Sequence, residues 1–201
     1  MNDDVAARRA RTQAFLEYLG REIPGCRIAF KDDPPSTMPW KDRLLHALGR
    51  VFVPQYQTRY TTVIHPTIYF YEGARARFEA TPEQFYTTLR HEFVHLKDFQ
   101  RFPLWMTVSY AGLLPVGWTM RAFWELRGYT QNLLCEHERT GRVSDEEVER
   151  VAEIFAGRGY IYMMLPKRRA RRALLEIRAK IEAGELRGPY PYGPLRHAPP
   201  E

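Results

Sequence analysis

His91-Glu92-Phe93-Val94-His95 is the stretch of this 201-residue chain that decides most about its fold. On an α-helix, residues i and i+4 lie one above the other, so both imidazoles can bind one metal ion while Glu92 faces its open coordination position. This HExxH spacing is typical of zinc sites in which a carboxylate takes a proton from an activated water. The pentapeptide therefore predicts a helix that holds Zn²⁺ through His91 and His95, with Glu92 as general base.

The residues before the pentapeptide also favour a helix. Thr81, Pro82 and Gln84 predict its start, with a threonine N-cap, a proline at the first helical position and a glutamine placed for a capping box. Apolar residues then follow at helical spacing, namely Phe85, Leu89, Phe93 and Leu96. The competing interpretation is a core helix whose histidines only hydrogen-bond to their neighbours. Two histidines beside a glutamate are costly to bury in that way, so we favour the metal site.

A catalytic zinc site needs a third protein ligand, and we favour Glu125. Residues 121–129 predict a second helix. Its polar side chains recur at spacings of four, four and three residues, as Arg121, Glu125, Tyr129 and Asn132. Bulky apolar residues flank this stripe on both sides. A carboxylate inside an apolar helix needs a partner, and a metal ion is one.

Other acidic and histidine side chains compete for that role. Glu136, His137 and Glu138 form a rival cluster, but they lie among charged residues typical of a solvated helix end, so we rank them below Glu125. Asp98 follows His95 by three residues and shares its helix face. An aspartate there suits a hydrogen bond that orients a ligand better than direct metal binding.

Three blocks of the sequence resemble a known group of proteins. They are TTVIHPTIYFYEG at 61–73, LRHEFVHLKDFQRFP at 89–103 and LPVGWTMRAFWELRGYTQN at 114–132. Together they resemble gluzincin-type zinc metallopeptidases, and more closely the small HExxH proteins of bacteria and tailed phages. The resemblance implies zinc on His91, His95 and Glu125, with Glu92 as the base. Many gluzincins carry an aspartate where this chain has Tyr129, which would either donate a hydrogen bond to a developing oxyanion or simply pack.

The fold class that we expect is α+β and zincin-like. A small N-terminal β-sheet would place an edge strand on the HExxH helix, and a mainly helical C-terminal part would follow. We expect helices at 7–21, 41–48 (ended by Gly49), 144–155 and 167–183, and strands at 26–30, 51–53 and 60–71, with Pro66 indicating an edge or a break. Residues 1–184 would form a single domain, and residues 185–201 a Pro-rich arm that is extended or disordered.

Composition and charge indicate in which compartment the protein acts and which partners it binds. The N-terminus lacks the apolar stretch of a secretory signal, and Cys26 and Cys135 suit free thiols, so we expect a cytoplasmic protein, or a virion-associated one if it is phage-encoded. The net charge of +6 comes largely from basic residues at 167–180, which indicate a solvated helix face more than a nucleic-acid interface.

The segment 102–120 holds no charged residue, and prolines and glycines interrupt it. We expect a packed connection that forms an apolar wall over the metal, with peripheral membrane contact as the alternative.

Together these features predict a zinc metallopeptidase that hydrolyses peptide bonds. Glu92 would move the proton, and Arg121 or Tyr129 would assist. The alternative is a phage or cellular assembly protein that keeps zinc as a structural element, with phage structural proteins as its partners and a possible contact to nucleic acid through its basic helix. A structural zinc site has four protein ligands, whereas a catalytic one leaves a position for water.

Overall fold

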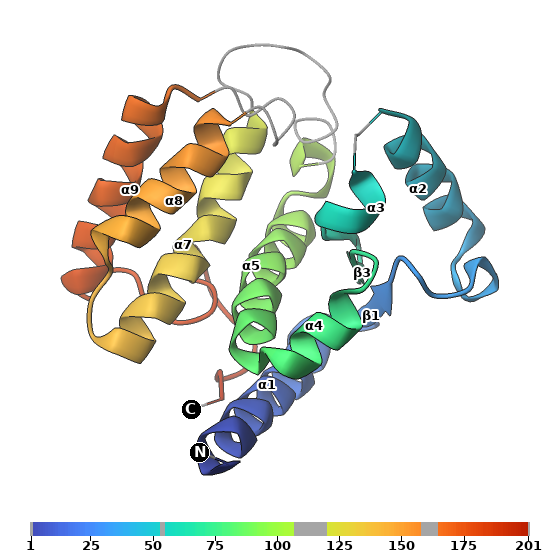
Figure 1. The fold of residues 1–201 in the computed structure, drawn as a ribbon, viewed down its shortest axis with the longest axis horizontal. Helices are drawn as coiled ribbons and strands as arrows, with labels where there is room; N and C mark the ends of the chain where they lie inside the picture. Colours follow the sequence, from blue (N-terminus) through green and yellow to red (C-terminus); the bar gives the residue numbers. More distant parts are fainter. Residues whose placement is uncertain (1, 53–54, 107–119, 158–164, 201) are drawn as a thin grey trace. The chain divides into compact units, whose positions relative to one another are not determined.

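The computed structural model describes residues 2–52, 55–106, 120–157 and 165–200 of the chain (Figure 1). These residues form a mainly helical α+β fold with one small sheet, which confirms the predicted class. The chain folds into two compact units, residues 1–86 with the last two residues, and residues 87–199. The boundary between the two units, at residues 86 and 87, falls inside the single domain predicted for residues 1–184. The zincin-like character of that domain stays a prediction.

The described residues of the first unit form a three-stranded sheet, four helices, a 3₁₀ turn and the first turn of a fifth helix. Its elements are α1 (Asn2–Glu22), β1 (Arg27–Phe30), η1 (Pro35–Thr37), α2 (Trp40–Phe52), α3 (Tyr56–Arg59), β2 (Thr62–Ile64), β3 (Thr67–Phe70), α4 (Ala74–Ala80) and the first turn of α5 (Pro82–Arg101). β3 lies at the centre of the sheet, parallel to β1 and antiparallel to β2. Its four residues are buried, because both of its edges are paired and apolar side chains cover its faces.

The predicted strand at 60–71 is divided at the position that the proline indicated. The peptide bond between His65 and Pro66 is cis, and the chain turns there from β2 into β3. The strand that meets the HExxH helix is the central one, since Phe70 of β3 packs against Phe85 in the first turn of α5 with ring centroids 5.4 Å apart. The free edges of the sheet belong instead to β1 and β2.

Two expectations about residues 41–53 are wrong. The helix α2 does not end at Gly49, and Val51 lies in its last turn rather than in a strand. Gly49 continues the helix because the ring of Tyr56 fills the space beside it: a Cβ there would lie 2.7 Å from Tyr56 Cζ. The glycine is thus required by packing and does not mark the end of the helix. Val53 lies outside the described residues.

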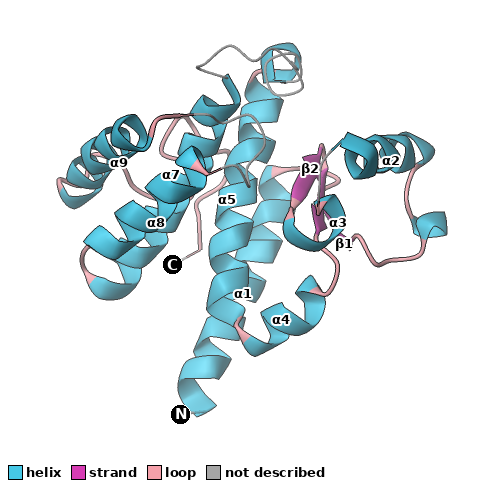
Figure 2. Cartoon of the chain, turned by 45° about the horizontal axis from the view of Figure 1, so that its top comes forward, coloured by secondary structure: helices cyan, strands magenta, loops and turns pink. Residues whose placement is uncertain are grey.

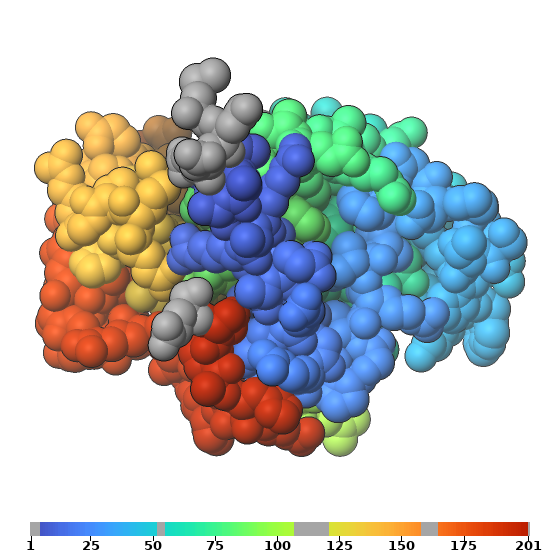
Figure 3. All heavy atoms as spheres, turned by 90° about the horizontal axis from the view of Figure 1, so that it is seen from below, coloured from blue at the N-terminus to red at the C-terminus, as the bar shows by residue number. Residues whose placement is uncertain are grey.

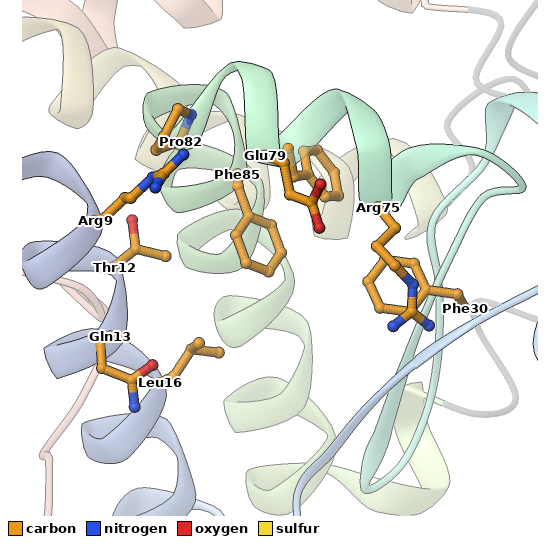
Figure 4. Close-up of a pocket in the computed structure, with 10 residues that line it drawn as sticks. Arg9, Thr12, Gln13, Leu16, Phe30, Arg75, Glu79, Pro82 and Phe85 are labelled. Carbon is orange, nitrogen blue, oxygen red and sulfur yellow. The ribbon is translucent and has the colours of Figure 1, made fainter. Parts of the chain in front are cut away.

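A pocket of about 580 Å³ lies on the first unit between α1, α4 and the start of α5 (Figure 4). Phe30, Phe78 and Phe85 supply its apolar surface, with the Phe78 and Phe85 rings stacked at a centroid distance of 4.5 Å. The Arg75 guanidinium lies 4.3 Å above the Phe30 ring and pairs with Asp33 at 2.8 Å. The residues of the predicted metal site do not line this pocket.

The second unit is a group of helices, α5, α7 (Met120–Thr140), α8 (Asp145–Ala156) and α9 (Lys167–Glu182), which Figure 2 shows side by side. Apolar side chains from α7, α8 and α9 form its core, including Leu133, Val151, Phe155, Leu174 and Ile181. The pattern of apolar residues on each helix therefore determines which face turns inward.

The ends of α8 and α9 follow the expectations from sequence. Ser144 caps α8 by accepting a hydrogen bond from the Glu147 amide at 3.1 Å, and Gly184 follows α9 with a positive φ of 71°. Part of the positive charge of α9 pairs with acidic residues of α8, as between Arg178 and Asp145 at 2.6 Å. These ion pairs support the interpretation of α9 as a solvated face.

After α9 the chain continues as an arm without helix or strand in residues 185–200, seen in red at the lower edge of Figure 3. Turns and bends interrupt it, and the expectation of an extended or disordered arm stays a prediction. The arm is not free along its whole length, because Tyr190 is buried and the Gly188 carbonyl accepts a hydrogen bond from Gln131 of α7 at 3.3 Å. In the described part of the chain, no helix is long and apolar enough to cross a membrane.

Candidate metal centre

The helix α5 brings both predicted histidine ligands to one point. His91 and His95 are one turn apart in the middle of the helix, and both are buried. Their Nε2 atoms lie 3.2 Å apart. The rigid helix therefore presents two imidazole nitrogens to the same small volume, with Glu92 also buried beside His91.

The neighbouring helix α7 supplies a carboxylate to this volume. Glu125 Oε2 lies 3.5 Å from His91 Nε2 and 3.8 Å from His95 Nε2. Zn²⁺ with bonds of about 2.0–2.1 Å separates its tetrahedral ligands by roughly 3.4 Å, so these distances suit one shared ion. Among the described residues, His91, His95 and Glu125 are the group that could hold a metal ion, as predicted.

The protonation states of two of these side chains favour metal binding. Burial lowers the pKa of His95 to about 4, so its imidazole is neutral near pH 7. Burial alone would raise the pKa of Glu125, but its hydrogen bond with His91 and the nearby positive charges hold it well below its usual range. A neutral imidazole and a carboxylate are the forms that bind metals.

His91 is the exception among the ligands. Burial lowers its pKa, but its hydrogen bond with Glu125 and the charge of Glu92 outweigh burial and raise the pKa above its usual value. Without a metal, these contacts favour the protonated form of His91, whose positive charge offsets part of the negative charge around it. Binding of an ion would displace this proton, because the ion needs the same lone pair.

Asn132 orients His91, a role that the sequence interpretation missed. Its side-chain Oδ1 lies 3.1 Å from His91 Nδ1 and accepts a hydrogen bond from it. Because Nδ1 keeps its proton in this hydrogen bond, Nε2, which faces Glu125 and His95, is the nitrogen of His91 that would bind the ion. The polar stripe in the sequence already places Asn132 two turns after Glu125 on the same face of α7, which is the signal for this role.

Gly128 provides the space that the His91 ring occupies. A Cβ built on this glycine would lie 2.6 Å from His91 Nε2, well inside any normal contact. Glycine within a helix costs about 1 kcal/mol relative to alanine, so its place in the interior of α7 needs a reason. The close approach of the two helices at the ligand His91 supplies that reason.

The two residues predicted to assist catalysis lie beside the ligands. The Tyr129 ring stands edge-on to His91 at a centroid distance of 4.8 Å and also packs on Phe155 at 5.5 Å, so it belongs to the core of the unit. Arg121 is half-buried one turn before Glu125, and its charge lowers the pKa of both Glu125 and His95. The sequence left two roles open for Tyr129, and its contacts with His91 and Phe155 show one of them, packing.

Asp98 joins three segments of the second unit. It is fully buried and receives two hydrogen bonds from the Arg127 guanidinium of α7, one of them from Nε at 2.8 Å. The Tyr190 hydroxyl of the C-terminal arm donates to Asp98 Oδ1 at 2.7 Å. The aspartate predicted to orient a ligand therefore connects the HExxH helix to α7 and to the arm.

The rival acidic cluster serves other contacts. Glu136 accepts hydrogen bonds from the amide and the hydroxyl of Ser144 at the start of α8. Glu138 accepts two from Arg90 Nη1, at 2.7 and 2.6 Å. Neither carboxylate belongs to the metal-binding group, which favours Glu125 as the third ligand. The predicted apolar wall falls largely on residues 107–119, outside the described residues.

Comparisons with protein families, with curated proteins and with solved structures find no match to this chain. The resemblance to gluzincin-type peptidases thus stays a prediction based on the three sequence blocks.

Proposed function

We propose that this protein is a zinc-dependent metallopeptidase whose ligands are His91, His95 and Glu125. The spacing of their three ligand atoms, 3.2, 3.5 and 3.8 Å, carries the proposal, because it matches the face of a zinc coordination tetrahedron. In the described part of the chain the group offers three protein ligands, which agrees with a catalytic centre that keeps its fourth position for water.

The side chains around this group would divide the chemistry between them. Bound zinc would polarise the scissile carbonyl and lower the pKa of a water molecule. Glu92, next to His91 on α5, would take the proton of the attacking water and pass it to the leaving amine. Arg121 would add positive charge near the developing oxyanion, and Asn132 would keep His91 Nε2 directed at the site. The substrate would be a peptide or an unstructured protein segment.

The test compares two glutamate variants with the unmodified full-length protein. Glu92→Gln removes the proton acceptor, so we expect it to bind about one zinc per chain but to lose hydrolysis of a peptide library by at least about a hundredfold. Glu125→Ala removes a ligand and should weaken zinc binding, measured by competition with a chromogenic chelator. Glu136→Ala is the matched control and should bind zinc normally.

Other outcomes would reject parts of the proposal. A folded protein that takes up no zinc from zinc-replete medium rules out the metal site. Full zinc binding without hydrolysis, together with no thermal shift from a hydroxamate, would favour a structural metal in an assembly protein instead.

A further inference from the structure

The helix α2 turns its apolar side to solvent. Five of its side chains lie along one face of the thirteen-residue helix, and their exposed fractions are 72, 54, 49, 45 and 76% for Trp40, Leu44, Leu45, Leu48 and Val51. Their spacing follows the helical period, so they form one stripe. An apolar face of this length exposed to water indicates a binding surface.

The opposite face of α2 is polar and holds the helix in this orientation. Asp42 is buried and accepts a hydrogen bond from the Tyr69 hydroxyl at 2.6 Å, while His46 Nδ1 lies 2.8 Å from the Tyr56 hydroxyl. The His46 ring also stands edge-on to Tyr69 at 4.4 Å. Rotating the helix to bury its apolar stripe would break these contacts. The outward stripe is therefore fixed by the fold.

The exposed charges of α2 all have the same sign. Lys41, Arg43 and Arg50 are exposed, whereas Asp42, the single acidic residue of the helix, is buried beneath it. The surface that α2 presents is therefore apolar, with Arg43 and Arg50 along one side and Lys41 within the stripe at the first turn of the helix. A tryptophan at one end adds a side chain that favours the boundary between headgroups and acyl chains.

We propose that α2 is an interfacial helix that binds anionic lipid surfaces, with the apolar stripe in the acyl boundary and the basic residues at the phosphates. An amphipathic helix with Trp and Leu on one face and Lys and Arg beside it suits this geometry. A second copy of the chain is a poorer partner, because two such faces would bring six like charges, three from each α2, to one interface. The proposal does not depend on the metal centre.

Vesicle binding by the full-length protein tests this directly. At low salt, the protein should bind large vesicles of phosphatidylcholine with roughly one third phosphatidylglycerol and appear with them in the pellet after centrifugation. Much less protein should appear in the pellet with vesicles of pure phosphatidylcholine. Arg43→Gln/Arg50→Gln should weaken binding to the anionic vesicles by about tenfold or more. Raising the salt concentration should likewise weaken the binding of the unmodified protein to anionic vesicles.

A matched pair of variants tests the apolar stripe. Leu44→Glu places a charge in it and should abolish sedimentation with vesicles while near-ultraviolet circular dichroism stays unchanged, since Leu44 is already exposed. Leu104→Glu changes an 81% exposed leucine elsewhere and should bind like the unmodified protein. The proposal is overturned if the unmodified protein does not bind anionic vesicles, or if Leu104→Glu abolishes binding while Leu44→Glu does not. It is also overturned if the protein self-associates in a concentration-dependent way that Leu44→Glu removes.

Discussion

Gly128 and Asn132 affect the geometry of the metal centre although neither binds the ion. The glycine leaves room for the His91 ring, and the amide oxygen of Asn132 holds the proton on the far nitrogen of that ring. Both lie on α7, beyond Glu125. A ligand on one helix is thus positioned by residues of the next, which is why the HExxH pentapeptide alone cannot define the site.

Gly128→Ala should disturb the metal centre in spite of its better helix propensity. The new Cβ would meet His91 Nε2 at 2.6 Å, so the ring must move away from its position beside Glu125. We expect zinc affinity to fall by about ten- to hundredfold, as for other residues that support ligands. Chelator competition measures this fall.

The control for this variant is Gly20→Ala in α1. Apart from the neighbouring backbone of α1 itself, no atom lies within 4 Å of a Cβ at that position, so alanine should stabilise the protein by up to about 1 kcal/mol and leave zinc affinity unchanged. Equal zinc affinities for Gly128→Ala and the unmodified protein would contradict the close approach of His91 to α7.

At the scale of elements, α2 shows how tertiary contacts override local patterns. Its apolar residues follow the helical period, yet they face solvent, and the polar Asp42 and His46 are the buried ones. The interaction that fixes this orientation is the packing of Tyr56 and Tyr69 beneath the helix. The stability of the first unit should therefore depend on the charge of His46.

Stability should decrease as the pH falls towards the acidic range. Burial lowers the pKa of His46 to about 4 in the folded protein, while the unfolded chain binds a proton near the ordinary value of 6.5. The unfolded state therefore holds more protons between these values, and the free energy of unfolding falls as the pH drops from 6.5 to 4. Urea unfolding at several pH values, with chelator present, measures this dependence.

His46→Gln should reduce this pH dependence, because glutamine does not titrate, while the buried His95 still contributes to it. His197→Gln, which changes an exposed histidine of the arm, is the control. If both variants follow the unmodified protein, His46 is not the group that titrates.

The metal-binding helix could be predicted from sequence because its evidence is local. Pro82 begins α5 as expected, and the i, i+4 spacing already places His91 and His95 on one face. Glu125 could be inferred because a carboxylate in an apolar helix needs a partner. The roles of Asn132 and Gly128 could not, since they depend on how α5 and α7 approach one another. The prediction that Gly49 ends its helix is wrong for the same reason. The glycine accommodates the ring of Tyr56, a residue beyond the end of α2, and local helix patterns do not include such a contact.

At the scale of the molecule, the C-terminal arm stabilises the second unit. Tyr190 reaches the buried Asp98, and the ring of Tyr192 lies 3.8 Å below the Arg127 guanidinium. Arg101 at the end of α5 donates to the Tyr192 carbonyl at 2.7 Å. The arm therefore holds α5 and α7 together over the ion pair of Asp98 and Arg127.

Tyr190→Phe should lower the free energy of unfolding by about 1.5–3 kcal/mol, the range for a hydrogen bond to a charged group. Tyr192→Phe should have a smaller effect, because its hydroxyl donates to the Arg127 carbonyl over a longer distance of 3.5 Å. Urea unfolding of both variants gives the comparison. A larger loss for Tyr192→Phe would contradict the assigned role of Tyr190.

The glycine beside His91 also gives a way to recognise related chains by sequence. Inserting or deleting one residue between Glu125 and Gly128 would rotate the rest of α7 by about 100° and bring a side chain to the place of the imidazole. A change between Gly128 and Asn132 would instead move the Asn132 amide away from His91 Nδ1. A chain with this centre must therefore keep glutamate, glycine and asparagine in the spacing E-x2-G-x3-N after its HExxH helix. A search with both patterns together would separate chains built around this metal centre from those that contain HExxH by chance.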